Sequence, residues 1–417
     1  MSSPQPTAPT SFSQGYTPNP TSRPTRKEIL NYSAPWPVYG LDWSNQPTER
    51  EALRLAVGSF IEDGSNKIQV ITLPEFAGIE GMDYSPTSMS DWVPIAETNH
   101  QYPVTKIKWE PYKGGHRSFD LLATTGDYLR LWELKEGAEN TSSGTIGRRA
   151  SSTNGQQLVQ QAVLANTKAN FCAPLTSFDW NTFDPALIVT SSIDTTCTVW
   201  NVETQQAKTQ LIAHDKEVYD VTFAGNNADI FASVGADGSV RMFDLRALEH
   251  STIIYETTSS LAPKGTTSQS GAPQAAPLLR LAFNKLDANY LSTFHMDSSS
   301  VQILDIRVPG IPVSDLRGHK GPVNCMAWSP IGSTEIATGS DDHQVFIWEV
   351  SQMRSDRDES DHHHGRASIT PATGTRVLHE PFRAANVGGE VNQLSWSSAS
   401  PDWVAVGFGR TVQALRL

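Results

Sequence analysis

The sequence predicts an all-β protein: a single ring of seven four-stranded antiparallel blades with a disordered N-terminal tail and loop insertions. Three observations support this fold class. A short alternating strand recurs seven times along the 417 residues, two further strands follow each copy, and an Asp marks the turn between these two strands in five copies. Repeats of roughly 40–45 residues, lengthened here by insertions, are typical of a β-propeller.

The first strand of each copy begins with an apolar residue and reaches an aromatic one five positions later. In VYDVTF, for example, Val218 leads to Phe223. Alternation at period two gives a strand one buried face. The other six pairs are Val38/Trp43, Val104/Trp109, Leu175/Trp180, Leu278/Phe283, Val323/Trp328 and Val391/Trp396.

The second and third strands of each copy follow in a fixed register, as in IFASVGAD and SVRMFDL. The fifth copy has one residue more between its turn Asp and Leu304, which predicts a β-bulge in that strand. The first and last copies lack the turn Asp. The other five carry it at Asp127, Asp194, Asp237, Asp297 and Asp342.

The last copy stops at its third strand, which ends at Leu417. Its fourth strand must therefore come from another part of the chain, and Glu28–Tyr32, just before the first copy, is the obvious donor. Closing the ring in this way removes a free sheet edge.

The copies are unevenly spaced because the chain contains segments rich in Ser, Thr, Gly, Gln or Pro. Such segments favour disorder, since they offer too little apolar surface to offset the entropy lost on ordering. We expect residues 1–25 to form a disordered tail and residues 26–417 to form one propeller. The insertions are expected near residues 74–99, 136–167, 257–276 and 351–374.

Composition limits the classes of function. The net charge of −12 argues against direct nucleic-acid binding, which needs a cationic field. No apolar run approaches the roughly 20 residues of a membrane span, so we expect no membrane partner. The three cysteines form no C-x-x-C pair, which fits a reducing compartment such as cytoplasm or nucleus. The sequence has no Gly-rich phosphate loop, and we expect no cofactor.

Polar residues recur at matched positions and raise the question of catalysis. His214 lies 23 residues before Asp237, and His319 lies 23 before Asp342. A Ser, His and Asp set resembles a hydrolase triad, but a triad is normally built once, so a set that repeats in register is interpreted as structural. We therefore predict no enzymatic activity. Three blade networks are predicted. One contains His214, Ser233, Asp237 and Phe243, although Phe243 cannot donate a hydrogen bond. The others contain His319, Thr338, Asp342 and Trp348, and Thr190, Asp194 and Trp200.

Two motifs lie in the predicted insertions. His362–His364 are adjacent histidines without a carboxylate or Cys held by the fold, so we expect no physiological metal there. The sequence RRAS at Arg148–Ser151 resembles a basophilic kinase site, which makes Ser151 a candidate phosphorylation site; the alternative is an unmodified, solvated loop.

The register of the copies resembles that of the WD-repeat family. The segment Gly318–Val350 begins with Gly-His and ends its third strand with Trp348, which Glu follows instead of the family's Asp. The resemblance implies a seven-bladed propeller whose blades have four strands each.

The third strands of the fourth and fifth copies end alike, in Asp, any residue, Arg. SVRMFDLR contains Asp244 and Arg246, and SVQILDIR contains Asp305 and Arg307. Neighbouring blades would place both guanidiniums on one rim of the disc. This resembles the WDxR pattern of cullin-4 substrate receptors, in which the Arg pair meets the ligase's adaptor propeller, although Phe and Leu replace the Trp here. The alternative is that each Arg only pairs locally.

Several stretches resemble one WD-repeat subfamily: the TRANSPARENT TESTA GLABRA and anthocyanin-regulating proteins of plants and their animal counterpart, a ligase-associated factor. They include APWPVYGLDWS, NFCAPLTSFDWN and KTQLIAHDKEVYDVTF. The resemblance implies a monomeric, non-catalytic scaffold of cytoplasm and nucleus. Its implied partners are dual-specificity tyrosine-regulated kinases, transcription factors and the cullin-4 ligase adaptor.

Two rival classes stay open at this point. A single, unrepeated acid–base pair in the central channel would favour an enzyme. A basic, aromatic-lined face would favour a chromatin- or RNA-associated reader.

Overall fold

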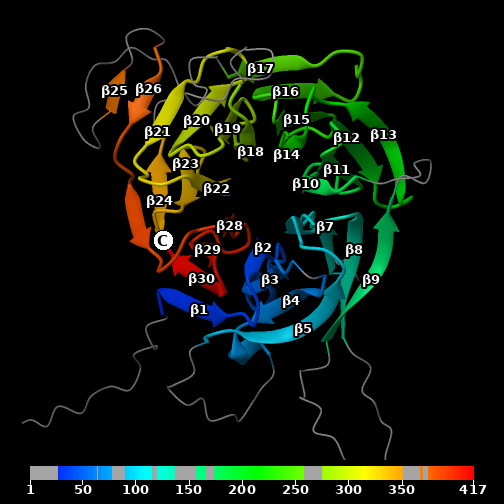
Figure 1. Ribbon diagram of the computed structural model, residues 1–417. Helices are drawn as coiled ribbons and strands as arrows, with labels where there is room; N and C mark the ends of the chain where they lie inside the picture. The colour runs from blue at the N-terminus through cyan, green and yellow to red at the C-terminus, as the bar shows by residue number, and fades with distance from the viewer. Residues whose placement is uncertain are drawn as a thin grey trace, which may run out of the picture.

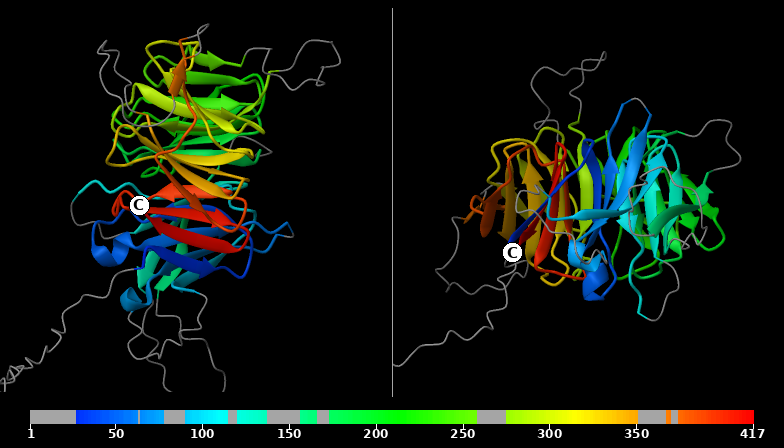
Figure 2. Two further views of the ribbon diagram at one scale, coloured as in Figure 1. Left: turned by 90° about the vertical axis from the view of Figure 1, so that its left-hand side faces the viewer. Right: turned by 90° about the horizontal axis from the view of Figure 1, so that it is seen from below.

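The computed structural model of the chain describes residues 27–62, 64–77, 90–114, 120–136, 156–165, 173–257, 275–350, 367–369 and 374–417. Within these residues the strands form seven sheets arranged around a central axis (Figure 1). Seen from the side, the sheets make a thick disc (Figure 2). The predicted all-β, seven-bladed propeller is confirmed.

In blades 1 to 6, four strands run outward from the axis in chain order. Blade 1 holds β2 (Val38–Trp43), β3 (Arg54–Ser59), β4 (Asn66–Thr72) and β5 (Val93–His100); blade 2 holds β6 (Lys106–Trp109), β7 (Leu121–Thr125), β8 (Leu129–Glu136) and β9 (Gln156–Leu164); blade 3 holds β10 (Leu175–Trp180), β11 (Leu187–Ser192), β12 (Thr196–Asn201) and β13 (Gln206–Ile212).

The later blades follow the same plan. Blade 4 holds β14 (Val218–Phe223), β15 (Ile230–Gly235), β16 (Ser239–Asp244) and β17 (Thr252–Glu256); blade 5 holds β18 (Leu278–Phe283), β19 (Tyr290–His295), β20 (Ser300–Asp305) and β21 (Ser314–Arg317); blade 6 holds β22 (Val323–Trp328), β23 (Glu335–Ser340), β24 (Gln344–Glu349) and β27 (Arg383–Asn386); blade 7 holds β28 (Gln393–Trp396), β29 (Trp403–Phe408) and β30 (Thr411–Arg416).

The ring closes as predicted. The fourth strand of blade 7 is β1 (Ile29–Ser33), which pairs antiparallel with β30 so that Leu30 lies opposite Ala414. The first and last strands of the chain thus share one sheet, and the outer edge of blade 7 is built from the N-terminal segment (Figure 1).

The aromatic residue that ends the first strand joins neighbouring blades, which explains its recurrence. Trp328 of blade 6 is 1% exposed and its indole N–H donates to Ala282 O of blade 5 at 3.1 Å. Trp43 of blade 1 likewise donates to Ser395 O of blade 7 at 3.0 Å. These side chains bury a large apolar surface between sheets and satisfy their one polar group at the same time.

Two insertions are shorter than the sequence predicted. All but the last residue of strand β5 lies within the expected insertion 74–99, and β9 lies within 136–167. Both are fourth strands at the outer edge, where only one face is buried. In β9, Leu158 is buried whereas Val159 is exposed, and four of its nine residues are Gln, so the segment resembles a polar linker.

The outer edge of blade 5 carries two additional strands. Strand β26 (Arg376–Leu378) pairs in parallel with β21, and β25 (Ala367–Ile369) pairs with β26. Part of the expected insertion 351–374 therefore extends a neighbouring blade. The bulge expected in β20 is also wrong: β19 and β20 pair in continuous register, and the extra residue lies in their turn, where Asp297 has φ of +58°.

Other predictions fall outside the described residues, namely the tail 1–25, the candidate phosphorylation site Ser151 and His362–His364. Among the residues with described positions, no helix has the length and apolar character needed to cross a membrane.

Candidate functional site

The first candidate site is the turn after β16 in blade 4. Arg246 folds back on Asp244: its Nε donates to Oδ1 at 2.9 Å and its Nη2 donates to Oδ2 at 2.6 Å. The backbone N–H of Arg246 also donates to Oδ1 at 3.0 Å. These bonds, led by the side-chain pair, lower the pKa of Asp244 to about 2, while the Arg246 side chain stays 65% exposed. The guanidinium is thus oriented locally and still open to solvent.

The turn after β20 in blade 5 repeats this geometry. Arg307 donates from Nε and Nη2 to Asp305 at 2.9 and 2.7 Å, and its side chain is 54% exposed. It has one further support, because Nη2 also donates to Tyr290 Oη at 2.9 Å and the guanidinium lies over the Tyr290 ring. Burial would raise the pKa of Asp305, but the bonds from Arg307 outweigh it and the pKa is lowered.

Both turns lie on one side of the disc, which carries the loops after the first and third strand of each blade; we call it the D-x-R face. In blades 1, 2 and 3 the Arg position holds Pro74, Lys135 and Glu203. Among the described third-strand ends, the Arg pair is therefore confined to blades 4 and 5. Large exposed apolar side chains lie in loops of the same face: Phe183, Leu286, Val308, Ile311, Ile331 and Phe382.

The polar set in blade 6 forms a connected buried network. His319 Nδ1 lies 3.0 Å from Asp342 Oδ2, and His319 Nε2 lies 2.8 Å from Thr338 Oγ1. The indole N–H of Trp348 donates to the same Thr338 hydroxyl at 2.9 Å. Burial lowers the pKa of His319, against the opposing effect of Asp342, so the ring is neutral at pH 7.

The set in blade 4 has the same arrangement without the indole. His214 Nδ1 lies 2.9 Å from Asp237 Oδ1, and its Nε2 lies 2.7 Å from Ser233 Oγ. Phe243, at the Trp position, stacks on Phe231 with ring centroids 5.0 Å apart. In both blades the His and the hydroxyl are buried and bonded to one another, so they have the surroundings of a structural network.

The set in blade 3 is only partly joined. The indole N–H of Trp200 donates to Thr190 Oγ1 at 2.9 Å. Asp194 instead caps its own turn and accepts from the hydroxyl and the backbone N–H of Thr196. No His links the carboxylate to Thr190, because the position four residues before Leu175 holds Phe171.

A network that the sequence reasoning missed lies in blade 2. His100 Nε2 is 3.2 Å from Thr124 Oγ1, and the indole N–H of Trp132 donates to this hydroxyl at 2.8 Å. The turn residue Asp127 pairs with Arg130 instead of the histidine. A signal was present, because His100 precedes the first apolar residue of its blade by four positions, as His214 and His319 do.

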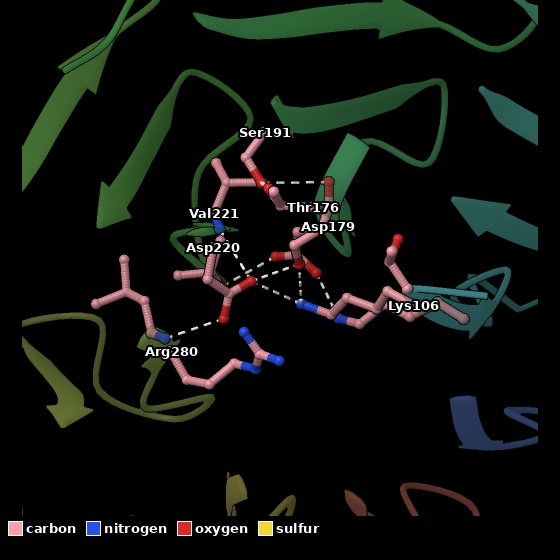
Figure 3. A network of polar contacts seen from close by, with 12 residues as sticks. Lys106, Thr176, Asp179, Ser191, Asp220, Val221 and Arg280 are labelled. Atoms are coloured by element: carbon pink, nitrogen blue, oxygen red, sulfur yellow. Dashed lines mark hydrogen bonds and ion pairs between the residues drawn. The ribbon is translucent and has the colours of Figure 1, made fainter. Parts of the chain in front are cut away.

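The central channel contains charged residues that the sequence reasoning also missed (Figure 3). Lys106 of blade 2 reaches across to Asp220 of blade 4, with Nζ 3.0 Å from Oδ1. Asp220 Oδ2 also accepts from the backbone N–H of Leu281 at 3.0 Å. Lys108, two residues further along β6, pairs with Asp179 of blade 3. These residues alternate with the core positions of the first strands, which is the signal that would have placed them in the channel.

These pairs bear on the enzyme alternative, because each is an unrepeated acid–base pair. Burial would raise the pKa of Asp220, but the charges of Lys106 and Arg280 outweigh it and the pKa lies below its usual value. Burial would lower the pKa of Lys108, but Asp179 outweighs it and the pKa is raised. Both groups are thus charged at neutral pH, whereas a general acid or base works best with a pKa near the working pH. The pairs favour the non-catalytic interpretation.

Comparison with known proteins identifies the repeat and its relatives. The family model for the WD domain, G-beta repeat, matches residues 205–244 and 310–349. The chain is 45% identical over 392 residues to the DDB1- and CUL4-associated factor 7 homolog of Dictyostelium discoideum, covering 94% of this chain and 99% of that protein.

Two fungal relatives align over a similar length. An uncharacterized WD repeat-containing protein of Schizosaccharomyces pombe is 40% identical, with 94% of this chain and 90% of that protein covered. A WD repeat-containing protein of Saccharomyces cerevisiae is 34% identical, with 94% and 78% covered. The chain belongs to the WD-repeat family of β-propellers, in the group that includes the DDB1- and CUL4-associated factor 7 homolog.

Proposed function

We propose that the protein is a non-catalytic scaffold and a substrate receptor of a cullin-4 ubiquitin ligase, and that Arg246 and Arg307 contact the ligase's adaptor propeller. One observation carries the proposal: two exposed guanidiniums occupy equivalent turns of adjacent blades, each held by its own Asp. The name of the Dictyostelium relative, which aligns with this chain over nearly its full length, supports the ligase association.

The local pairing of each Arg is compatible with docking. Fixing a long side chain in advance reduces the entropy lost on binding. Each guanidinium uses Nε and Nη2 on its Asp, and its Nη1 has no hydrogen-bond partner among the described residues. That edge of the fork would meet a carbonyl or carboxylate of the partner.

The surroundings of the two arginines have the composition of a protein interface. Val308 directly follows Arg307 and is 56% exposed, and Leu286 and Ile331 are also exposed in loops of the D-x-R face. Interfaces are enriched in Arg and in apolar anchors at their centre, with few other charges. A partner propeller would bury these side chains together with the aliphatic stems of the arginines.

Kinase and transcription-factor docking is the second part of the proposal, and we assign it to the opposite face, in the cytoplasm and nucleus. Exposed Phe60, Tyr102 and Ile193 lie in loops of that face. A propeller that holds one partner on each face brings the two close together and raises their effective concentration. This arrangement suits a receptor that presents a bound protein to a ligase.

The double variant Arg246→Ala, Arg307→Ala tests the proposal. We expect its affinity for the purified cullin-4 adaptor to fall by about a hundredfold or more, because interface arginines are frequent hot spots. Melting temperature and circular dichroism should match the wild type, since both side chains are exposed, and kinase docking should persist.

Arg317→Ala is a matched control. Arg317 lies in blade 5, pairs with Asp315 at 2.6 Å and is 55% exposed, but it lies beside Ser300 at the other end of β20. This control should bind the adaptor as the wild type does. Wild-type affinity in the folded double variant would refute the assignment.

A further inference from the structure

We propose that the central channel binds the phosphate group of a small organic molecule, which enters from the D-x-R face and contacts Lys285 and Lys108. This site is separate from the Arg pair, and its existence does not depend on ligase association. The inference rests on a cavity, on an excess of positive charge within it, and on the polar and apolar groups that share its wall.

The cavity has a volume of about 610 Å³. This lies within the range of roughly 300–1,000 Å³ that is typical of small-molecule sites. It runs from the middle of the first strands, at Lys106 and Arg280, to the loops that follow them. Residues of these loops form its mouth on the D-x-R face: Pro47, Tyr112, Thr182, Gly225, Lys285 and Ser398.

The charges in this cavity do not balance. Four cationic side chains line it, Lys106, Lys108, Arg280 and Lys285, and three carboxylates face them, Asp42, Asp179 and Asp220. Lys106 and Lys108 have ion-pair partners, but neither Arg280 nor Lys285 forms an ion pair within the described part of the chain. An excess of cations inside a channel of an acidic protein concentrates anions there.

Lys285 lies at the mouth of the cavity, near a second cation, Lys108. Desolvation, followed by the charge of Lys108, lowers the pKa of Lys285. Burial raises the pKa of Asp42, against the opposing charges of Lys108 and Lys285. Lys285 Nζ donates only to Ser398 Oγ, at 3.3 Å, among the described side chains. A phosphate would supply the missing negative charge to two lysines at once.

The remaining wall suits the organic part of such a ligand. Apolar side chains that line the same cavity and are at least partly exposed include Pro47, Tyr112 and Met326. The hydroxyls of Thr222 and Ser395 add polar groups close to the lysines. An apolar wall with a few convergent polar and charged groups is the usual composition of a small-molecule site.

Isothermal titration with pyrophosphate, as a probe for the phosphate group, tests the inference on the full chain. We expect saturable binding at one site per chain that weakens as sodium chloride is raised. Lys285→Gln should weaken binding about tenfold or more, because it removes a charge-assisted contact, and Lys285→Arg should largely restore it. Lys208→Gln, an exposed lysine on the outer strand β13, should leave binding unchanged.

Absence of saturable binding to the wild type would overturn the inference. Equal affinities of Lys285→Gln and Lys208→Gln for pyrophosphate would overturn it as well. The variant Arg246→Ala, Arg307→Ala should bind pyrophosphate as the wild type does, so a failure of the ligase proposal and a failure of the channel site give different results.

Discussion

The hydroxyl of Thr338 joins two buried groups, and its removal gives the sharpest test of the blade network. His319 is neutral and donates a hydrogen bond from its Nδ1–H to Asp342, so its Nε2 accepts a hydrogen bond from the Thr338 hydroxyl. The same oxygen accepts from the indole N–H of Trp348. Thr338→Val keeps the shape of the side chain but removes the donor and the acceptor together.

The cost follows from the burial of all three groups. Thr338 is 0% exposed and Trp348 is 1% exposed, so water cannot replace the lost partners. Each buried polar group left unsatisfied costs about 1–3 kcal/mol. Two such groups, the His319 nitrogen and the Trp348 N–H, should lower the free energy of unfolding by about 2–6 kcal/mol.

Equilibrium urea unfolding, followed by the fluorescence of the tryptophans, measures this loss as a shift of the transition midpoint. Thr338→Ser is the control, because it keeps the hydroxyl and loses only a methyl group, at a cost of about 0.5–1.5 kcal/mol. Adaptor binding should be unchanged in both variants. If Thr338→Val were no less stable than Thr338→Ser, the network would not stabilise the blade and the reasoning would fail.

The remaining predictions concern pH and the length of an insertion. Burial lowers the pKa of His100, His295 and His319, so the unfolded chain takes up protons near pH 6.5 that the folded protein does not. Stability should therefore fall as the pH drops below about 6.5, by at most about 1.4 kcal/mol per pH unit for each histidine; a melting temperature that stays constant from pH 7.5 to 5 would contradict this. Replacing Glu136–Thr167 with a Gly/Ser linker should cause aggregation, visible in size-exclusion chromatography, because it deletes β9. Replacing only residues 138–154 should leave the melting temperature within a few degrees, and a large drop would show that these residues support the blade.

The inner three strands of each blade could be predicted because their core positions are tied to contacts that every blade repeats. The aromatic at the end of the first strand packs against the preceding blade, as Trp328 does on Ala282. Its place in the repeat is therefore the same in every copy. The fourth strands have no such constraint. In β13 only the alternate positions Thr209 and Leu211 are partly covered, and the other five residues are exposed. Polar outer strands therefore resemble linkers, and the sequence predicts insertions at β5 and β9 for this reason.

The polar networks were predictable only where all members kept the same positions. His319 and Asp342 did so, and their blade contains the full chain of contacts. In blade 2 the turn residue Asp127 binds Arg130, so the pairing of His with the turn Asp does not identify His100. His100 nevertheless contacts the hydroxyl of Thr124, as His319 contacts that of Thr338. The hydroxyl of the second strand is the constant part of the network: it accepts from an indole in blades 2, 3 and 6, and Ser233 contacts His214 in blade 4, which has no indole.

Alternation along the first strands places the charges in the channel, but their pairing could not be predicted, for a reason that concerns closure of the ring. Lys106 and Asp220 occupy the same position, two residues after the first apolar residue, in blades 2 and 4. Their sequence separation of 114 residues carries no periodic signal, and they meet only because the ring turns both strands toward one axis. The side chains at these positions point into the channel and do not pack in the core between blades, so no repeated contact restricts which residue occupies them. The repeated contacts fix the walls of the propeller, whereas the residues of its channel differ from blade to blade, as Lys106 and Asp220 do.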